Sequence, residues 1–152
     1  MSMKNIVLIV FLLFSFYCSA QDKLLFGKWK IVSVSGDGYY FNSEKDSVFL
    51  SDVFKERLHN DSKIINDAKN LIRKTYLNAL YFYDEFGNHS EVSDKRKEKY
   101  KYSVDIKKSN IQYKDFENNT LMFEVPYKIE NNNLHLTVEQ KYGNANLVLK
   151  RE

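Results

Sequence analysis

Strict alternation of apolar and polar residues dominates the second half of the chain, and a period of two is typical of half-buried β-strands. Residues 120–130 show it most clearly, since every second residue from 121 to 129 is apolar and the residues between include Glu124 and Lys128. Residues 134–139 alternate in the same way. The asparagines at 131–133 separate the two segments, and asparagine tolerates the backbone of tight turns. The pattern therefore predicts an antiparallel hairpin.

Six further segments have strand character, which brings the predicted number of strands to eight: 26–34, 79–85, 89–92, 98–107, 111–113 and 145–151. For residues 79–86 the sequence does not decide which face points inward, because the apolar residues at 80 and 82 compete with the tyrosines at 81 and 83. Pro126 lies on the predicted solvent face of its strand. Its missing N–H predicts a bulge or a kink there.

Between residues 51 and 77 the apolar spacing changes to that of amphipathic helices. Residues 61–77 carry one apolar stripe, and Asn60, Asp61 and Ser62 offer N-cap side chains for it. Residues 51–59 predict a shorter helix capped by Ser51. We therefore expect a helical segment inserted between the first and second strands, preceded by an exposed loop at residues 36–47.

The first twenty residues have the features of a cleavable signal peptide: Lys4, an apolar core at residues 6–16, and the small residues Ser19 and Ala20. The core is too short to span a bilayer. We therefore expect residues 21–152 to form one secreted or periplasmic domain, without stable membrane insertion after cleavage. The alternative is a lipid anchor on Cys18, although the bulky residue before it does not suit a lipoprotein signal.

The predicted mature chain is close to neutral. Residues 1–20 contain one lysine and no acidic residue, so 22 basic and 20 acidic residues remain, a net charge of +2. Such a weak field does not favour nucleic acid or an anionic membrane as a partner. The only cysteine leaves with the signal peptide, so a hydrophobic core rather than disulfides must hold the domain together.

Recognisable catalytic and metal-binding motifs are missing from the sequence. His59, His89 and His135 are scattered, and none has a second ligand at metal-binding spacing. The glycines form neither a phosphate loop nor a nucleophile elbow. In the basic run at 93–101, strand parity places Lys99 and Lys101 on an outer face, which indicates a solvated hairpin rather than a nucleic-acid strip. We therefore expect a protein that is not an enzyme and has no catalytic residue, metal or cofactor.

A Gly-x-Trp sequence opens the first predicted strand. Gly27 removes a side chain where another group must approach closely, and Trp29 is well placed to close one end of a barrel. The first strand, the eight-strand pattern and the Leu147–Arg151 ending resemble the calycin superfamily, the lipocalins and fatty-acid-binding proteins, and most of all small secreted bacterial lipocalin-like domains. In the first strand, the likeness is carried by Phe26, Gly27, Trp29, Lys30 and Val32.

This resemblance implies a mainly β fold, an eight-stranded antiparallel up-and-down barrel. It also implies that a basic residue from late in the chain stacks over the tryptophan, and Arg151 is the candidate, so that Gly27, Trp29 and Arg151 together close the barrel. The helical insertion is similar to that of fatty-acid-binding proteins, where such helices cover the barrel mouth. Those proteins hold a carboxylate with Arg-x-Tyr near the end, whereas this chain ends Lys150-Arg151-Glu152.

A small eight-stranded barrel either fills its interior or holds one small ligand, and tyrosines suit a cavity that is partly apolar and partly hydrogen-bonding. We expect a small, largely apolar ligand inside. The alternative is a non-enzymatic interaction module, a filled barrel or a cystatin-like sheet on the long helix, that binds an unidentified protein through surface loops such as 36–47. The predicted cavity wall consists of Tyr100, Tyr102, Val104, Tyr113, Phe123, Val125, Tyr127 and Leu136.

Overall fold

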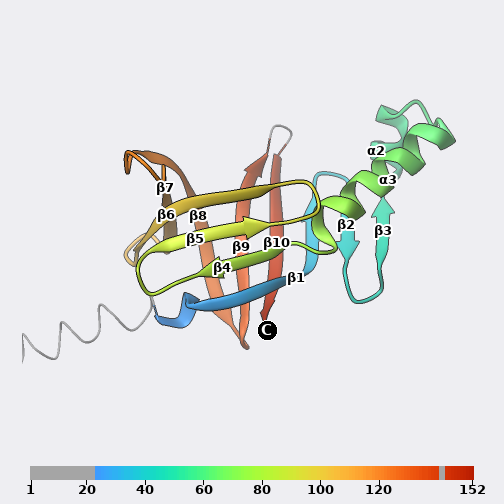
Figure 1. Ribbon diagram of the computed structural model, residues 1–152. Helices are drawn as coiled ribbons and strands as arrows, with labels where there is room; N and C mark the ends of the chain where they lie inside the picture. Colours follow the sequence, from blue (N-terminus) through green and yellow to red (C-terminus); the bar gives the residue numbers. More distant parts are fainter. Residues whose placement is uncertain (1–22, 141–142) are drawn as a thin grey trace, which may run out of the picture.

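The computed structural model describes residues 23–140 and 143–152 and consists mainly of antiparallel strands (Figure 1). Two helices, α2 (Asp52–Arg57) and α3 (Ser62–Tyr76), lie between the third and fourth strands. The strands are β1 (Gly27–Gly36), β2 (Tyr39–Asn42), β3 (Ser47–Leu50), β4 (Leu80–Tyr83), β5 (Asn88–Val92), β6 (Lys97–Asp105), β7 (Asn110–Lys114), β8 (Leu121–Glu130), β9 (Asn133–Gln140) and β10 (Gly143–Arg151).

Eight of these strands form a closed antiparallel barrel. Strands β4 to β10 follow one another as a meander, and β1 pairs with β4 on one side and with β10 on the other. Trp29 stands opposite Tyr81 of β4 and opposite Arg151 of β10. The first and last strands are therefore hydrogen-bonded neighbours, and the predicted eight-stranded barrel is confirmed.

The segment after β1 differs from the expectation. Strands β2 and β3 form a hairpin that pairs with the C-terminal half of β1, so the exposed loop predicted at residues 36–47 is wrong. The helices follow β3, and they are not inserted directly after the first strand. The physical reason is burial: Phe41 and Leu50 are fully buried, and Gly38, with a φ of 81°, supplies the tight connection between β1 and β2.

The helices begin where the sequence predicts. The Ser51 hydroxyl accepts a hydrogen bond from the Phe54 N–H at 3.2 Å, and the Asp61 carboxylate accepts one from the Lys63 N–H at 2.8 Å. Helix α3 packs against β2 and β3, and its last residue, Tyr76, stacks on Tyr39. The helical pair therefore rests on the hairpin, at the side of the barrel (Figure 1).

Strand β8 changes partner along its length. Residues 121–126 pair with β7, whereas the ladder with β9 runs only from Tyr127 opposite Leu136 to Glu130 opposite Asn133. The β7–β8 ladder shifts register opposite Met122, so the bulge lies there and not at Pro126, which pairs with Asn110. Among the described residues, the first half of β8 has no ladder partner on its β9 side.

The barrel interior holds one continuous apolar core. Tyr81 and Tyr83 of β4 point into the core, so in this strand the tyrosines, and not Leu80 and Phe82, form the inner face. Opposite them, the interior includes Ile111 of β7 and Leu134 of β9, both fully buried. The tyrosines are inside because polar partners for their hydroxyls lie there: Glu91 on the neighbouring strand for Tyr81, and the Tyr113 hydroxyl for Tyr83.

The predicted signal peptide, with Cys18, lies outside the described residues. Within residues 23–140 and 143–152, the structure contains no helix that is both long and apolar enough to cross a membrane.

Candidate ligand-binding cavity

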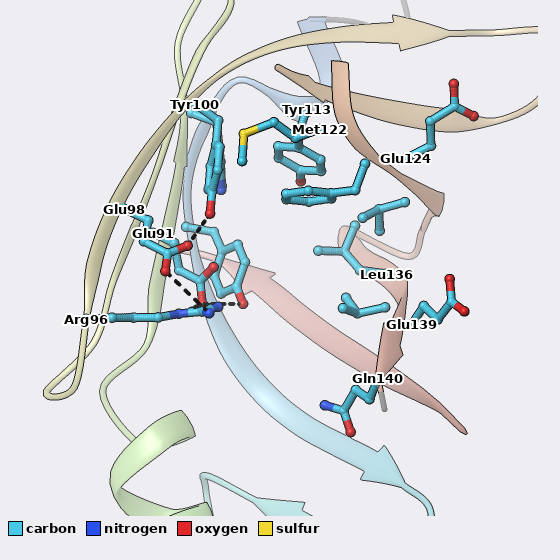
Figure 2. Close-up of a pocket in the computed structure, with 15 residues that line it drawn as sticks. Glu91, Arg96, Glu98, Tyr100, Tyr113, Met122, Glu124, Leu136, Glu139 and Gln140 are labelled. Atoms are coloured by element: carbon cyan, nitrogen blue, oxygen red, sulfur yellow. Dashed lines mark hydrogen bonds and ion pairs between the residues drawn. The ribbon is translucent and has the colours of Figure 1, made fainter. Parts of the chain in front are cut away.

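A partly open cavity of about 860 Å³ occupies the barrel interior beside the unpaired half of β8 (Figure 2). Its walls come from β4, β5, β6, β7, β8 and β9 and from the turn between β5 and β6. The lining residues are Tyr81, His89, Glu91, Arg96, Glu98, Tyr100, Tyr113, Met122, Phe123, Glu124, Val125, Leu136, Val138, Glu139 and Gln140. The partner change in β8 creates this space, because two strands that do not form a ladder need not approach to 4.8 Å.

Three aromatic rings form one wall of the cavity. The ring centres of Tyr113 and Phe123 are 4.9 Å apart and nearly parallel. Tyr100 meets both rings edge-on, at 5.8 Å from Tyr113 and 5.4 Å from Phe123. On the opposite side Leu136 points into the space (Figure 2). Such a wall suits a flat or elongated apolar group.

A polar cluster stands at the other end of the cavity (Figure 2). The Arg96 guanidinium donates to the Glu91 carboxylate through Nη2 at 2.5 Å and through Nε at 3.2 Å, and its Nη1 lies 3.6 Å from Glu98. The Tyr81 hydroxyl donates to Glu91 at 2.9 Å, and the Tyr100 hydroxyl donates to Glu98. One guanidinium therefore faces two carboxylates, and each carboxylate also binds a phenol.

Strand register explains why these five side chains meet. Glu91 pairs with Tyr81 of β4 on one side and with Glu98 of β6 on the other, so the three share one row across the sheet. Arg96 comes from the turn between β5 and β6, where its N–H binds the Ser93 hydroxyl at 3.2 Å. Antiparallel neighbours on one face are about 5 Å apart, which is within hydrogen-bonding reach of side chains of this length.

The cluster perturbs the ionisation of its members. Burial and the bond to Glu98 raise the pKa of Tyr100 to about 12. Burial and Glu91 also raise the pKa of Tyr81. Burial alone would lower the pKa of Arg96, but its bonds with Glu91 outweigh that effect and raise the pKa. Both phenols are therefore neutral hydrogen-bond donors, and the guanidinium stays charged.

His89 lies between the polar cluster and the aromatic wall and is only 3% exposed. Its ring lies 4.3 Å from that of Tyr83 and 5.1 Å from that of Tyr113, centre to centre. Its Nδ1 is 3.1 Å from the Phe82 carbonyl oxygen, which can only accept, so Nδ1 carries the proton. Burial lowers the pKa of His89 to about 3, so the imidazole is neutral near pH 7.

Five of the eight residues predicted for the cavity wall line it. They are Tyr100, Tyr113, Phe123, Val125 and Leu136. The other three, Tyr102, Val104 and Tyr127, pack in or against the core without lining the cavity. The Tyr102 hydroxyl donates to the Asp84 carbonyl at 2.9 Å, which holds it at another part of the barrel. The bulge at Met122 brings Met122 and Phe123 to the cavity together, although parity assigns them to opposite faces.

The three residues predicted to close the barrel lie together at one end. The indole of Trp29 is 1% exposed, and its Nε1 donates to the Leu25 carbonyl at 2.7 Å. The Arg151 guanidinium carbon lies 4.8 Å from the centre of the indole, the placement that the resemblance implies. A Cβ atom at position 27 would lie 3.9 Å from Arg151 Nε, an ordinary contact distance, so the expected close approach of another group is not found. Glycine is favoured at this position because its φ is 128°, which other residues rarely adopt.

Sequence reasoning missed the polar side of the cavity, namely Tyr81, His89, Glu91, Arg96 and Glu98. A signal was present for two pairs. His89 and Glu91 alternate on one face of β5, and Glu98 shares a face with Tyr100. Arg96 carries no such signal, because it belongs to a turn and follows no strand parity. The basic run at 93–101 is therefore only in part a solvated hairpin.

Comparison with known proteins supports the fold alone. No protein-family model and no curated protein matches the sequence. A solved structure, the crystal structure of a DUF4847 family protein from Bacteroides vulgatus, is similar with a TM-score of 0.50 at 13% identity. The match covers 88% of this chain and 97% of that chain. It fits an antiparallel barrel over nearly the whole described domain.

The described residues contain no group of three or more His, Cys, Asp or Glu side chains arranged to hold a metal ion.

Proposed function

We propose that this protein is a secreted or periplasmic, non-enzymatic member of the lipocalin-like barrels that binds a small, largely apolar molecule in its interior. The single observation that carries the proposal is the cavity of about 860 Å³, a volume within the range of small-molecule sites. A filled barrel of eight strands would leave no such space.

The composition of the cavity supports an apolar ligand with a polar end. The rings of Tyr100, Tyr113 and Phe123 and the aliphatic side chains of Val125 and Leu136 provide surface for burial, at about 25 cal/mol for each Å² removed from water. The cluster around Arg96 stands at one end only and can orient a polar group. A ligand enters beside β8, where its first half lacks a ladder partner on the β9 side among the described residues.

The test uses 1,6-diphenylhexatriene, an uncharged hydrocarbon whose fluorescence rises in an apolar site. We expect saturable binding of one probe per chain. The double variant Phe123→Trp/Val138→Trp enlarges two lining residues on the strands that border the gap, the 41% exposed Phe123 and the half-buried Val138. Because these indoles occupy the cavity, we expect probe affinity to fall by about tenfold or more.

Ile106→Trp is the matched control, since it adds the same side chain at an exposed turn outside the cavity. Its probe affinity should equal that of the unmodified protein. Absence of saturable binding, or equal affinity in the double variant and the control, would contradict an interior site.

A second candidate function rests on the β2–β3 hairpin. Tyr40 and Phe49 stand opposite each other on its outer face and are 42% and 63% exposed. Exposed aromatic pairs are common anchors in protein interfaces. Tyr39, by contrast, is engaged with Tyr76 and Phe54. A protein partner that is captured by the unmodified protein and lost on Tyr40→Ser/Phe49→Ser would favour the interaction module over the carrier.

A further inference from the structure

The charged side chains of the cavity are mostly acidic. Among the described residues that line it, Arg96 is the only cation, against four carboxylates. Glu124 and Glu139 direct their carboxylates away from the space (Figure 2), and Glu124 binds Gln112 at 2.8 Å outside it. Within residues 23–140 and 143–152, the charges that face the space are therefore those of Glu91, Glu98 and Arg96, two negative and one positive.

Arg96 is not available to an anionic ligand. Its Nε and Nη2 both bind Glu91, and its Nη1 faces Glu98. A carboxylate entering the cavity would have to displace one of these partners and would then lie against two like charges. Like charges within a few ångströms are costly in a partly buried site, where water screens them less than in bulk solution.

The remaining polar atoms favour a donor on the ligand. Since Nδ1 of His89 donates to Phe82, Nε2 is left as a lone-pair acceptor, and no described residue binds it. His89 is 97% buried and lines the cavity. It shares its face of β5 with Glu91 two residues away, a separation of about 7 Å along the strand. A buried acceptor without a hydrogen bond costs free energy, and a ligand that donates a hydrogen bond to it removes this cost.

The aromatic wall adds a second attraction for positive charge. The faces of Tyr100, Tyr113 and Phe123 carry the negative part of the ring quadrupole, which attracts cations that lie above them. The same rings provide apolar surface for the rest of a ligand. The cavity thus combines a net negative polar end, an unmet acceptor and aromatic faces.

We propose that the cavity selects amphiphilic amines, protonated amino groups carried on an apolar chain or ring, over carboxylates of the same size. The ammonium group lies near Glu91 and Glu98, and its N–H donors reach these carboxylates or His89 Nε2. The apolar body lies along Tyr100, Phe123 and Leu136. This inference rests on the proposed interior site and names the class of molecule that occupies it.

Three probes with one ten-carbon chain test it: decylamine, decanol and decanoate, each below its micelle concentration at pH 7. Each competes with bound 1,6-diphenylhexatriene. We expect decylamine to displace the hydrocarbon at about a tenfold lower concentration than decanoate, with decanol between them. If the hydrocarbon itself does not bind, the proposed function fails. If it binds and decanoate competes as well as decylamine, only the charge preference fails.

Two variants shift the preference in opposite directions. Glu91→Gln removes one negative charge, so decylamine should bind about three- to tenfold more weakly and decanoate more tightly. Arg96→Gln removes the positive charge, so decylamine should bind more tightly and decanoate more weakly. Structural damage cannot produce this crossing, because it would weaken both probes in both variants. That uniform loss, or no change in either variant, would overturn the proposal.

Glu130→Gln is the matched control. Glu130 lies on β8 outside the cavity and forms an exposed ion pair with Lys128 at 2.8 Å. The substitution changes the net charge of the protein as Glu91→Gln does. It should leave the affinity of all three probes unchanged. An equal shift in Glu130→Gln would assign the preference to the overall charge of the protein and overturn the cavity as its source.

Discussion

Replacing Trp29 by alanine should lower the free energy of unfolding by about 3 to 5 kcal/mol. The indole is 1% exposed, so the substitution leaves a large cavity in the closed end of the barrel. It also removes the donor that binds the Leu25 carbonyl at 2.7 Å and the ring beneath the Arg151 guanidinium. For a domain of this size, the loss corresponds to a decrease in Tm of about 10 to 20 °C.

Urea unfolding followed by circular dichroism measures this change without depending on tryptophan fluorescence. The double-mutant cycle of Trp29→Leu with Arg151→Met then isolates the contact between the two side chains, because leucine has no aromatic face. Methionine keeps an apolar stem while removing the charge. We expect a coupling energy of about 0.5 to 1 kcal/mol, the range for a cation over an aromatic ring at an exposed site.

Lys150→Met is the control for the cycle, because Lys150 is the exposed neighbour of Arg151 and faces the other side of β10. Its coupling energy with Trp29→Leu should be zero within error. A loss below about 1 kcal/mol for Trp29→Ala would refute the reasoning, since it would mean that the barrel end does not depend on the buried indole.

Two further predictions concern buried polar groups. The hydroxyls of Tyr83 and Tyr113 lie 2.6 Å apart in the core. Tyr113→Phe leaves the Tyr83 hydroxyl without this partner, so it should lower the free energy of unfolding, measured with urea, by about 1 to 3 kcal/mol. The double variant Tyr83→Phe/Tyr113→Phe should lower it by less, because neither hydroxyl remains. The pKa of His89 is depressed from 6.5 to about 3 in the folded protein, so the unfolded chain binds the extra proton between these values and stability falls as pH drops through this window. In His89→Gln, the free energy of unfolding from urea titrations should depend on pH less steeply, by up to about 1.4 kcal/mol per pH unit. His135→Gln, the control, should keep the pH dependence of the unmodified protein. The same pH profile in His89→Gln and the unmodified protein would contradict a buried neutral imidazole.

Much of the fold could be read from local sequence. Alternation in residues 98–107, 120–130 and 134–139 gives the strands β6, β8 and β9, because one buried face per strand imposes a period of two. The caps at Ser51 and Asp61 mark the helix starts, because their side chains satisfy free N–H groups of the first turn. The β2–β3 hairpin was missed, since four-residue strands are too short for alternation to be distinguished from a loop.

The candidate site was predictable only on its apolar side. Tyr100, Tyr113 and Phe123 follow from strand parity, which selects one face of each strand. The polar end depends on which strands are neighbours and in which register, so Glu91 and Glu98 could not be brought together with Tyr81 from sequence alone. Arg96 depends on a turn conformation for which period-two reasoning has no rule.

The sequence by itself determined the eight strands of the barrel and the helix starts, because each depends on residues close together in the chain. Only the tertiary structure decided that β8 leaves β9 at Pro126, and with it the position and size of the cavity. It also decided that this cavity has an acidic end with one engaged arginine. Both features arise from contacts between strands far apart in sequence, where a one-residue change in register moves every side chain to the other face.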